Sequence, residues 1–327
     1  MWLYILIAML AFSLIGGYVF SSLLLMRYPS ILHRRKKIKF KCRHISHRGG
    51  AGENLENTMT AFKFAADVTG TDMLEIDCHA TKDGQVVVSH DDNLLRSTGR
   101  DVLISKTNYQ DLPPLKACMK VDFYPDHSIS AGDDRRIPLL ADVFKAFPHL
   151  PINIDIKVDN DVLIQKVSDL TKEFNREHLT VWGNKSSIIT NKCYKQNPNI
   201  HLLSSLRRVI WIVVMFVTGL LPFVPMKEDF FEVIMPSILS RMMPPHEISR
   251  WHKFLIDLSE KVLINKTLFK HLERRGIQVY IWVLNDEAEY DRAFKAGATG
   301  VMTDFPTKLK RYLEEHPEYQ LKPNEHL

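Results

Sequence analysis

The chain has 327 residues, of which 45% are hydrophobic and 25% are charged, so it is too apolar for a disordered protein and long enough for one large folded domain. Its 4 cysteines are too few for a disulfide scaffold and lack the spacing of a structural zinc site, which is consistent with a reducing compartment. The net charge of +5 is local, because eight cations lie between Arg27 and Arg43, ahead of the first acid, Glu53. The remaining 35 cations face 38 acids, which argues against a nucleic-acid partner.

The first predicted element is a membrane anchor. Residues Trp2 to Met26 are about 25 uncharged residues, and a spanning helix needs about 20. The features of a cleaved signal peptide are absent, so residues 1–27 are expected to remain as a transmembrane helix. A basic juxtamembrane segment, 28–43, follows, and the positive-inside rule places the rest of the chain in the cytosol. The protein is therefore expected to be intracellular and bound to a membrane bilayer.

From residue 44 onward, short β-rich runs alternate with longer segments of helical apolar spacing. This alternation predicts an α/β fold, and the remaining length fits a TIM (β/α)8 barrel over residues 44–315, with a C-terminal tail at 316–327. Helices are expected at 57–68, 161–176, 269–275 and 287–296, with Asp161 and Asp286 as caps. One of nine predicted strands must lie outside the barrel. The nine predicted strands are 44–48, 73–78, 86–91, 152–157, 179–183, 201–205, 231–236, 279–285 and 300–304.

The first of these strands ends in the sequence HRGG. Gly49 and Gly50 would let the backbone turn tightly and approach a ligand. Arg48 offers planar bidentate hydrogen bonds to a phosphate, and His47 can transfer a proton near neutral pH. The motif therefore indicates an anion site, although a histidine with a purely structural role is equally compatible with it.

The next two strands are predicted to form a hairpin. The connection from Ala80 to Gln85 is far too short for a helical crossover, and Asp83-Gly84 is a strong two-residue turn signal. A hairpin centred on that pair sets Asp77 opposite His90.

Acidic residues share one face of two predicted strands. The period of two places Glu75 and Asp77 on one face, and Asn153, Asp155 and Lys157 on one face of the later strand. Paired carboxylates in a core require a counter-charge, and oxygen ligands suit a hard divalent cation such as Mg²⁺ or Ca²⁺. Each acid taken alone is more often a surface residue or part of a salt bridge.

A second apolar stretch, 209–226, lacks charge and is marginally long for spanning. A single crossing would separate strands that belong to one barrel, so we expect an insert that contacts the membrane surface, and Pro222 and Pro225 should break any straight helix near its end. An ordinary core helix is the alternative interpretation.

The motifs occur in a characteristic order: HRGGAGENLENT, TDMLEIDCHATKDGQVVVSHD, NIDIK, YIWVLN and GATGVMTDFP. Over residues 44–307 this order resembles the glycerophosphodiester phosphodiesterase family. With the anchor and the insert, the chain is most similar to the animal membrane-anchored members described as lysophospholipase D enzymes. The resemblance implies a TIM barrel of the phospholipase-C-like phosphodiesterase type and a divalent cation.

The resemblance also implies roles for individual residues. His47 and His90 match acid/base histidines, Arg48 matches a phosphate-contacting arginine, and Glu75 and Asp77 match metal carboxylates. The same motif position allows His90 to be a metal ligand through a neutral imidazole.

Four further residues match family positions. Glu56 matches the acid of a PENT-like motif and Trp282 an aromatic residue at the barrel mouth, so both are candidate substrate-binding residues. Lys157 matches a lysine that neutralises phosphate charge. Asp155 occupies the position of a third metal ligand that is usually Glu.

The leading hypothesis is a phosphoric diester hydrolase that converts lysophosphatidylcholine, lysophosphatidylethanolamine or N-acyl lysophosphatidylethanolamine to lysophosphatidate plus an alcohol or N-acylethanolamine. The endoplasmic reticulum or perinuclear membranes are the expected location. One alternative is the same chemistry on water-soluble glycerophosphodiesters. The other is a catalytically silent lipid-binding barrel, which two histidines near a metal site argue against.

Overall fold

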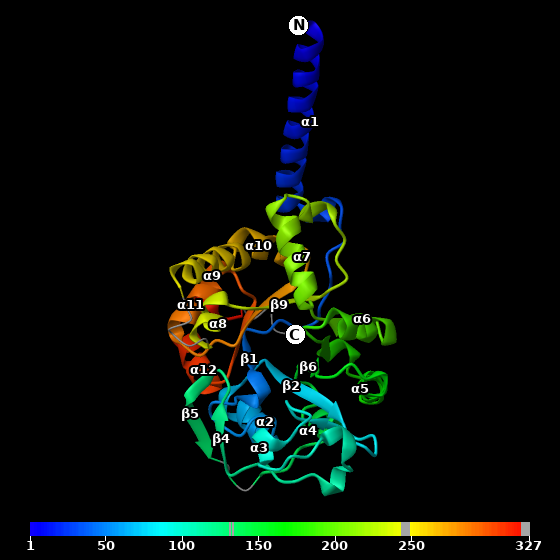
Figure 1. Cartoon of the computed structure of the whole chain (residues 1–327), viewed down its shortest axis with the longest axis vertical. Helices are drawn as coiled ribbons and strands as arrows, with labels where there is room; N and C mark the ends of the chain where they lie inside the picture. The colour runs from blue at the N-terminus through cyan, green and yellow to red at the C-terminus, as the bar shows by residue number, and fades with distance from the viewer. Residues whose placement is uncertain (131, 133, 243–248, 322–327) are drawn as a thin grey trace.

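The computed structural model describes residues 1–130, 132, 134–242 and 249–321, so the last six residues of the predicted tail lie outside the described part. A long helix, α1 (Trp2–Arg27), projects from a rounded α/β body (Figure 1). Within the described residues, α1 is the one helix long and apolar enough to cross a membrane, and its most apolar window is 0% buried. The body follows after the short helix η1 (Pro29–Ile31).

Eight parallel strands form the barrel, as predicted. Their spatial order is β8-β7-β6-β2-β1-β11-β10-β9, and the bridge between Leu203 and Phe230 joins the two ends. The strands are β1 (His44–Ser46), β2 (Met73–Ala80), β6 (Ile152–Ile156), β7 (Thr180–Gly183), β8 (His201–Leu202), β9 (Phe230–Ile234), β10 (Gln278–Trp282) and β11 (Gly300–Thr303).

The ninth predicted strand, β3 (Val86–Val88), is the one outside the barrel and pairs antiparallel with β2. The predicted register is wrong by one residue, because Cys78 lies opposite Val88, and the backbone N–H of Ser89 donates to the carbonyl of Asp77 at 2.9 Å. The cause is the turn. Gly84 donates to the carbonyl of Thr81 at 2.9 Å and has φ 78°, which is a three-residue loop ending in a left-handed glycine.

Helices surround the strands, and the four predicted helical segments are all helical. The helices of the body are α2 (Met59–Lys63), η3 (Phe64–Thr69), α3 (Leu95–Thr98), α4 (Leu140–Ala146), α5 (Asp161–Glu173), α6 (Ser187–Gln196), α7 (Leu206–Val217), α8 (Pro236–Met242), α9 (Arg250–Leu263), α10 (Lys266–Arg274), α11 (Glu287–Ala296) and α12 (Pro306–Glu315). Asp286 caps α11 through a capping box, as predicted. The predicted cap Asp161 is wrong, because the Asn160 side chain caps α5.

Shorter helices complete the connections. They are η2 (His47–Gly49), η4 (Ile104–Lys106), η5 (Tyr109–Asp111), η6 (Glu177–Leu179), η7 (Leu221–Phe223) and η9 (Pro317–Tyr319).

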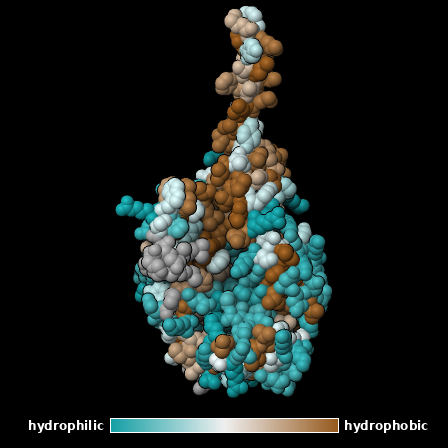
Figure 2. Space-filling view, in the orientation of Figure 1, coloured by the Kyte–Doolittle hydropathy of each residue, from teal (hydrophilic) through white to brown (hydrophobic). Residues whose placement is uncertain are grey.

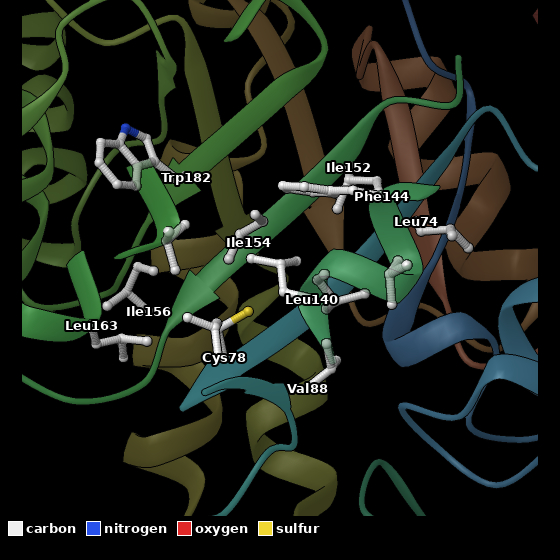
Figure 3. Packing of buried hydrophobic residues seen from close by; sticks show 14 of the residues in the cluster. Leu74, Cys78, Val88, Leu140, Phe144, Ile152, Ile154, Ile156, Leu163 and Trp182 are labelled. Atoms are coloured by element: carbon white, nitrogen blue, oxygen red, sulfur yellow. The ribbon is translucent and has the colours of Figure 1, made fainter. Parts of the chain in front are cut away.

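One face of β2 and β6 packs on the surrounding helices, and the opposite face carries the polar residues. Leu74, Cys78 and Ile154 lie in the buried cluster with Leu140 of α4 and Leu163 of α5 (Figure 3). The register of the two strands sets Glu75 beside Asn153 and Asp77 beside Asp155. The strand period therefore sorts apolar residues to the helix layer and acids to the barrel interior.

The apolar stretch 209–226 is a helix, α7, followed by η7, and no span crosses there within the described residues. The helix ends at Val217, ahead of the predicted break at Pro222, because Gly219 has φ 76°. One face of α7 is in the core, with Val209 and Ile212 buried. The other face exposes a stripe at helical spacing: Leu206, Ile210, Val214 and Val217.

The C-terminal half of α1 contacts this insert through hydrogen bonds and a pair of stacked rings. The Tyr18 hydroxyl donates to the carbonyl of Thr218, and the Ser22 hydroxyl donates to that of Gly219 at 2.7 Å. The rings of Tyr18 and Phe223 stack with centroids 6.2 Å apart. In Figure 2, hydrophobic residues continue from the projecting helix onto the body directly below it.

The segment between β3 and α4 forms an extra hairpin that the sequence analysis did not predict. Its strands are β4 (Cys118–Val121) and β5 (Tyr124–Ser130). Its turn carries Asp122 and Phe123, which reach the site described next.

Candidate active site

The chain leaves β1 in a strained turn that aims two side chains into the site. Arg48 has φ 50°, and Gly49 and Gly50 follow with φ 79° and 95°. Such backbone in a non-glycine residue is a signature of functional sites. The predicted tight turn is confirmed. Both glycines also allow close packing within the protein, since a Cβ on Gly49 would lie 2.6 Å from Phe62 and one on Gly50 would lie 2.7 Å from Pro306.

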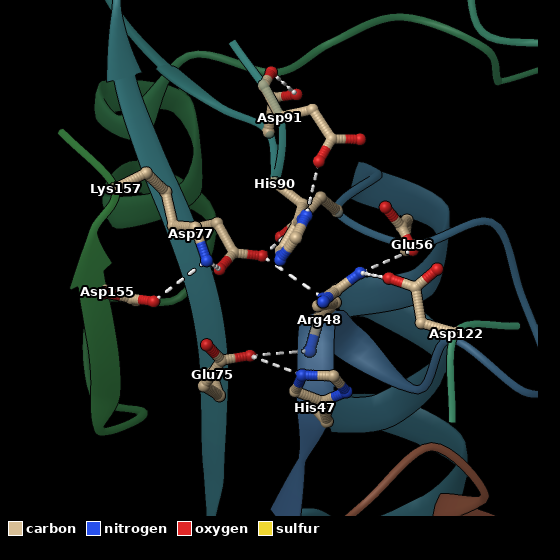
Figure 4. A network of polar contacts seen from close by, with 12 residues as sticks. His47, Arg48, Glu56, Glu75, Asp77, His90, Asp91, Asp122, Asp155 and Lys157 are labelled. Atoms are coloured by element: carbon tan, nitrogen blue, oxygen red, sulfur yellow. Dashed lines mark hydrogen bonds and ion pairs between the residues drawn. The ribbon is translucent and has the colours of Figure 1, made fainter. Parts of the chain in front are cut away.

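Glu75 and Asp77 stand side by side on β2, both buried (Figure 4). The Glu75 carboxylate accepts the backbone N–H of Arg48 at 3.0 Å. The Asp77 carboxylate accepts from the Asn57 amide at 2.9 Å and lies 3.3 Å from the Lys157 ammonium.

The pKa values of the two carboxyl groups shift in opposite directions. Burial raises the pKa of Glu75 well above its usual range, and the charge of Asp77 adds to that effect. Burial alone would raise the pKa of Asp77 too, but Lys157 and Arg48 outweigh it and lower that pKa. Positive charge placed beside the pair would favour the ionised form of both groups.

The donor atoms at this position fit a hard divalent cation in chemical type. Glu75, Asp77 and Asp155 supply carboxylate oxygens, and the buried amide oxygen of Asn57 has no hydrogen-bond partner among the described residues. The Lys157 ammonium neutralises part of this acidic charge, with its Nζ 3.0 Å from Asp155 and 3.3 Å from Asp77. In the part of the chain that the structure describes, no three His, Cys, Asp or Glu side chains converge in a metal-binding group.

His47 is oriented by an aspartate that the sequence analysis left outside the catalytic set. Its Nδ1 lies 2.6 Å from Asp304 Oδ1, while its Nε2 lies 3.9 Å from Glu75. Asn285 donates to the second oxygen of Asp304 at 2.9 Å. Neither Asp304 nor Asn285 is the N-cap of the helix that follows it, because Phe305 holds that position in α12 and Asp286 in α11. Their position at strand ends was the available signal.

His90 has an equivalent arrangement. Its Nδ1 lies 2.7 Å from Asp91 Oδ1, and Arg96 also binds Asp91 through Nε at 2.5 Å. Burial raises the pKa of Asp91, but hydrogen bonds from His90 and Arg96 outweigh burial and lower it. Figure 4 shows the His90 ring directed toward Asp77 and Arg48. Both imidazoles are thus fixed through Nδ1 by an aspartate, which leaves Nε2 to face the site.

The guanidinium of Arg48 is held by carboxylates. Nη1 donates to Glu56 at 2.9 Å and to Asp122 at 2.8 Å, and Nε lies 3.4 Å from Asp77. Arg96 binds the other oxygen of Glu56. Asp122 and Arg96 were not predicted, because they come from the irregular connection between β3 and α4.

Aromatic rings and a partly buried acid, Glu232, complete the site. Trp282 ends β10 and meets Phe123 edge to face at 6.4 Å, and Phe123 meets His47 in the same way at 5.7 Å. Deeper in the barrel, Glu232 accepts a hydrogen bond from Asn153 at 2.8 Å. Burial raises the pKa of Glu232 to about 7.

Imidazoles that can move protons, beside cationic groups that can bind a phosphate at the mouth of a parallel barrel, are what a phosphodiester hydrolase requires. Residues 47–308 match the Glycerophosphoryl diester phosphodiesterase family, and the chain belongs to that family.

Several curated proteins are similar over nearly the whole chain. "Lysophospholipase D GDPD1" of Rattus norvegicus is 62% identical over 301 residues, which cover 92% of this chain and 95% of the relative. The protein of the same name in Homo sapiens is 60% identical with the same coverage. "Lysophospholipase D GDPD3" of Homo sapiens is 39% identical over 94% of this chain and 96% of its own length.

Solved structures share the fold at low sequence identity. A glycerophosphoryl diester phosphodiesterase domain from Mycobacterium tuberculosis has TM-score 0.64 and 14% identity, covering 83% of this chain and 99% of its own. An Oleispira antarctica phosphodiesterase in complex with the product sn-glycerol-3-phosphate has TM-score 0.56 and 19% identity, covering 84% and 97%. These likenesses confirm the barrel.

Proposed function

We propose that this chain is a lysophospholipase D that cleaves the bond between phosphorus and the head-group oxygen of lysoglycerophospholipids. The products are lysophosphatidate and either an alcohol or an N-acylethanolamine. The observation that carries the proposal is the pair of imidazoles, each fixed by an aspartate, beside the buried acids Glu75 and Asp77. Relatives that are 60–62% identical and bear the name lysophospholipase D support the choice of substrate class.

The two histidines carry the proton transfers. One imidazole accepts the proton of the attacking oxygen as that oxygen bonds to phosphorus. The other donates a proton to the head-group oxygen as the bond from phosphorus to that oxygen breaks. Asp304 and Asp91 keep Nδ1 protonated in His47 and His90, so that Nε2 is the atom that exchanges protons.

Arg48 and Lys157 bind the phosphoryl oxygens in this proposal. Glu56 and Asp122 act through Arg48 as positioning residues, because their carboxylates hold its Nη1 at 2.9 and 2.8 Å. Trp282, together with Phe123, forms the aromatic side of the site against which substrate carbon atoms pack.

Glu75, Asp77 and Asp155 would hold a divalent cation, Mg²⁺ or Ca²⁺. His90 could be a ligand through Nε2 only in place of its role in proton transfer. Such a cation polarises phosphoryl oxygens and neutralises developing charge. The raised pKa of Glu75 and the unpartnered amide oxygen of Asn57 support a cation at this position.

The membrane supplies the substrate in this proposal. The helix α1 anchors the barrel on the cytosolic side of the endoplasmic reticulum or perinuclear membranes, and the exposed stripe of α7 contacts the bilayer surface. The hydrogen bonds from Tyr18 and Ser22 to the segment after α7 support this arrangement, since they place the insert at the end of the anchor. An amphiphile then reaches the barrel by lateral diffusion.

Substrate profiling of the full chain in detergent tests the function. Lysophosphatidylcholine, N-acyl lysophosphatidylethanolamine and glycerophosphocholine are compared, with and without a chelator. We expect cation-dependent release of lysophosphatidate, and its loss in His47→Ala and Glu75→Ala, with the exposed His149→Ala as control. Cleavage of glycerophosphocholine alone would favour the water-soluble alternative, and undiminished turnover in both variants would refute the site.

A further inference from the structure

A cavity of about 460 Å³ lies at the foot of α1, away from the catalytic residues. It is formed where the end of the helix and the start of the basic juxtamembrane segment meet α10. Its lining includes Arg27, Tyr28, Ser30, Arg35, Glu273 and Arg274. None of the residues assigned to phosphodiester cleavage lines it.

The cavity carries excess positive charge. Three arginines face a single acid, Glu273, whose carboxylate also lies 3.7 Å from Lys41 Nζ. Among the described residues, Arg35 and Arg274 form no ion pair, so their planar donors are available to a ligand. Arginine binds phosphate oxygens with paired N–H donors, and Ser30 adds a hydroxyl group to the lining.

The cavity is built on a fixed junction. The imidazole of His271 on α10 donates to the carbonyl of Met26 at 3.0 Å, one residue before Arg27. The His33 ring binds the carbonyl of Pro222 at 2.8 Å on the other side. The end of the helix is therefore held against the barrel, and the position of the arginines relative to α1 is set.

The level of the cavity along α1, and so relative to a bilayer, indicates which ligand it binds. The apolar run of α1 ends at Arg27, so a bilayer crossed by α1 has its headgroup layer at this level. Phosphate groups of lipids are the anions concentrated there. A net positive lining favours a headgroup with net negative charge over a zwitterionic one.

We propose that this cavity binds the headgroup phosphate of an anionic glycerophospholipid of the surrounding bilayer, as a site separate from the catalytic one. The proposal rests on the anchoring of the chain by α1. It gives the basic segment after the anchor a specific ligand, and the bound lipid fixes the height and tilt of the barrel on the membrane.

Native mass spectrometry of the full chain in neutral detergent tests the site. The protein is mixed with equal amounts of phosphatidylserine and phosphatidylcholine of identical acyl chains, and the retained lipid is counted. We expect wild type to prefer phosphatidylserine by about tenfold or more, and the double variant Arg35→Ala/Arg274→Ala to lose that preference. The matched control, Arg34→Ala/Lys37→Ala, removes the same charge from the same region outside the cavity and should retain it.

Two further measurements separate the possible failures. Displacement of phosphatidylserine by millimolar inorganic phosphate would identify a free-phosphate site and overturn the lipid assignment, as would equal loss of preference in both double variants. Extraction of the wild-type chain from membranes by alkaline carbonate would refute anchoring itself. Lysophospholipid turnover in micelles should be the same in both double variants, because neither pair touches the catalytic residues.

Discussion

The two active-site histidines receive their orientation from different parts of the chain. Asp304 follows β11, more than 250 residues after His47 along the chain, whereas Asp91 is the residue next to His90. Each aspartate accepts from Nδ1 and so fixes which nitrogen faces the site. In the proposed mechanism, proton exchange at Nε2 therefore depends on Asp304 and Asp91, which act through the imidazoles.

Replacement of Asp304 by Asn should expose this dependence. An amide can donate to Nδ1 and stabilise the wrong tautomer of His47, so we expect turnover to fall by about 100-fold or more with little change in KM. Steady-state kinetics and the pH profile of kcat measure the effect. The exposed Asp67→Asn is the matched control, and turnover in Asp304→Asn within twofold of wild type would contradict the role.

Replacement of Asp155 by Asn tests the third candidate ligand. The enzyme is first treated with a chelator, and Mg²⁺ or Ca²⁺ is then added back. Loss of one carboxylate should raise the cation concentration for half-maximal activity by about 10- to 100-fold. Turnover at saturating cation should largely recover, and Asp155→Glu, which keeps the carboxylate, should require less cation than Asp155→Asn. Full activity of wild type after exhaustive chelation would exclude this role.

At the scale of single elements, the turn after β1 requires glycine at position 50 for two reasons: a positive φ and close contact with Pro306. Substitutions can measure the two effects separately. Gly50 has φ 95° and abuts Pro306, whereas Gly70 has φ 66° with nothing within 4 Å of an added Cβ. We expect Gly70→Ala to cost about 1 kcal/mol of unfolding free energy from backbone strain alone. Gly50→Ala should cost about 2–4 kcal/mol, because a steric clash adds to the strain. Denaturant unfolding in detergent compares them, and equal losses would show that the contact with Pro306 is unimportant.

The elements also show what the sequence could and could not predict. Strand period alone correctly placed Glu75 and Asp77 on one face, because alternation follows from backbone geometry. The hairpin register failed by one residue, because two- and three-residue turns share the signal Asp83-Gly84. His90 nevertheless lies near enough to Asp77 to help lower the pKa of Asp77. It does so from the loop that follows β3, which ends at Val88.

The remaining site residues belong to an irregular connection that periodicity does not describe. Arg96 and Asp122 meet Glu56 and Arg48 through a helix of four residues and the turn of a hairpin. These contacts join residues that are 40 and 74 positions apart in the chain, and no local pattern predicts such a pairing. The family resemblance indicated Arg48 and Glu56 as candidates but gave no sign of Asp122, which binds Arg48, or of Arg96, which binds Glu56.

At the scale of the whole molecule, one buried histidine joins the anchor to the barrel. His271 on α10 donates through Nδ1 to the carbonyl of Met26, and its Nε2 is buried without a hydrogen-bond partner among the described residues. Burial lowers the pKa of His271 to about 4, and the nearby basic residues Arg275, His33 and Arg274 act in the same direction. A proton on Nε2 is therefore strongly disfavoured while the junction is closed.

This junction should weaken in acid. An opened or unfolded chain takes up a proton on His271 near its ordinary pKa of about 6.5, but the folded chain does so only near 4, so stability falls as the pH drops from 6.5 to 4. One proton contributes at most about 1.4 kcal/mol per pH unit. In His271→Gln, which does not titrate, the fall in Tm between pH 7 and 5 should be smaller than in wild type, as measured by thermal unfolding in detergent. The exposed His149→Gln should keep the wild-type slope, and an unchanged slope in His271→Gln would show that the closed junction does not exclude this proton.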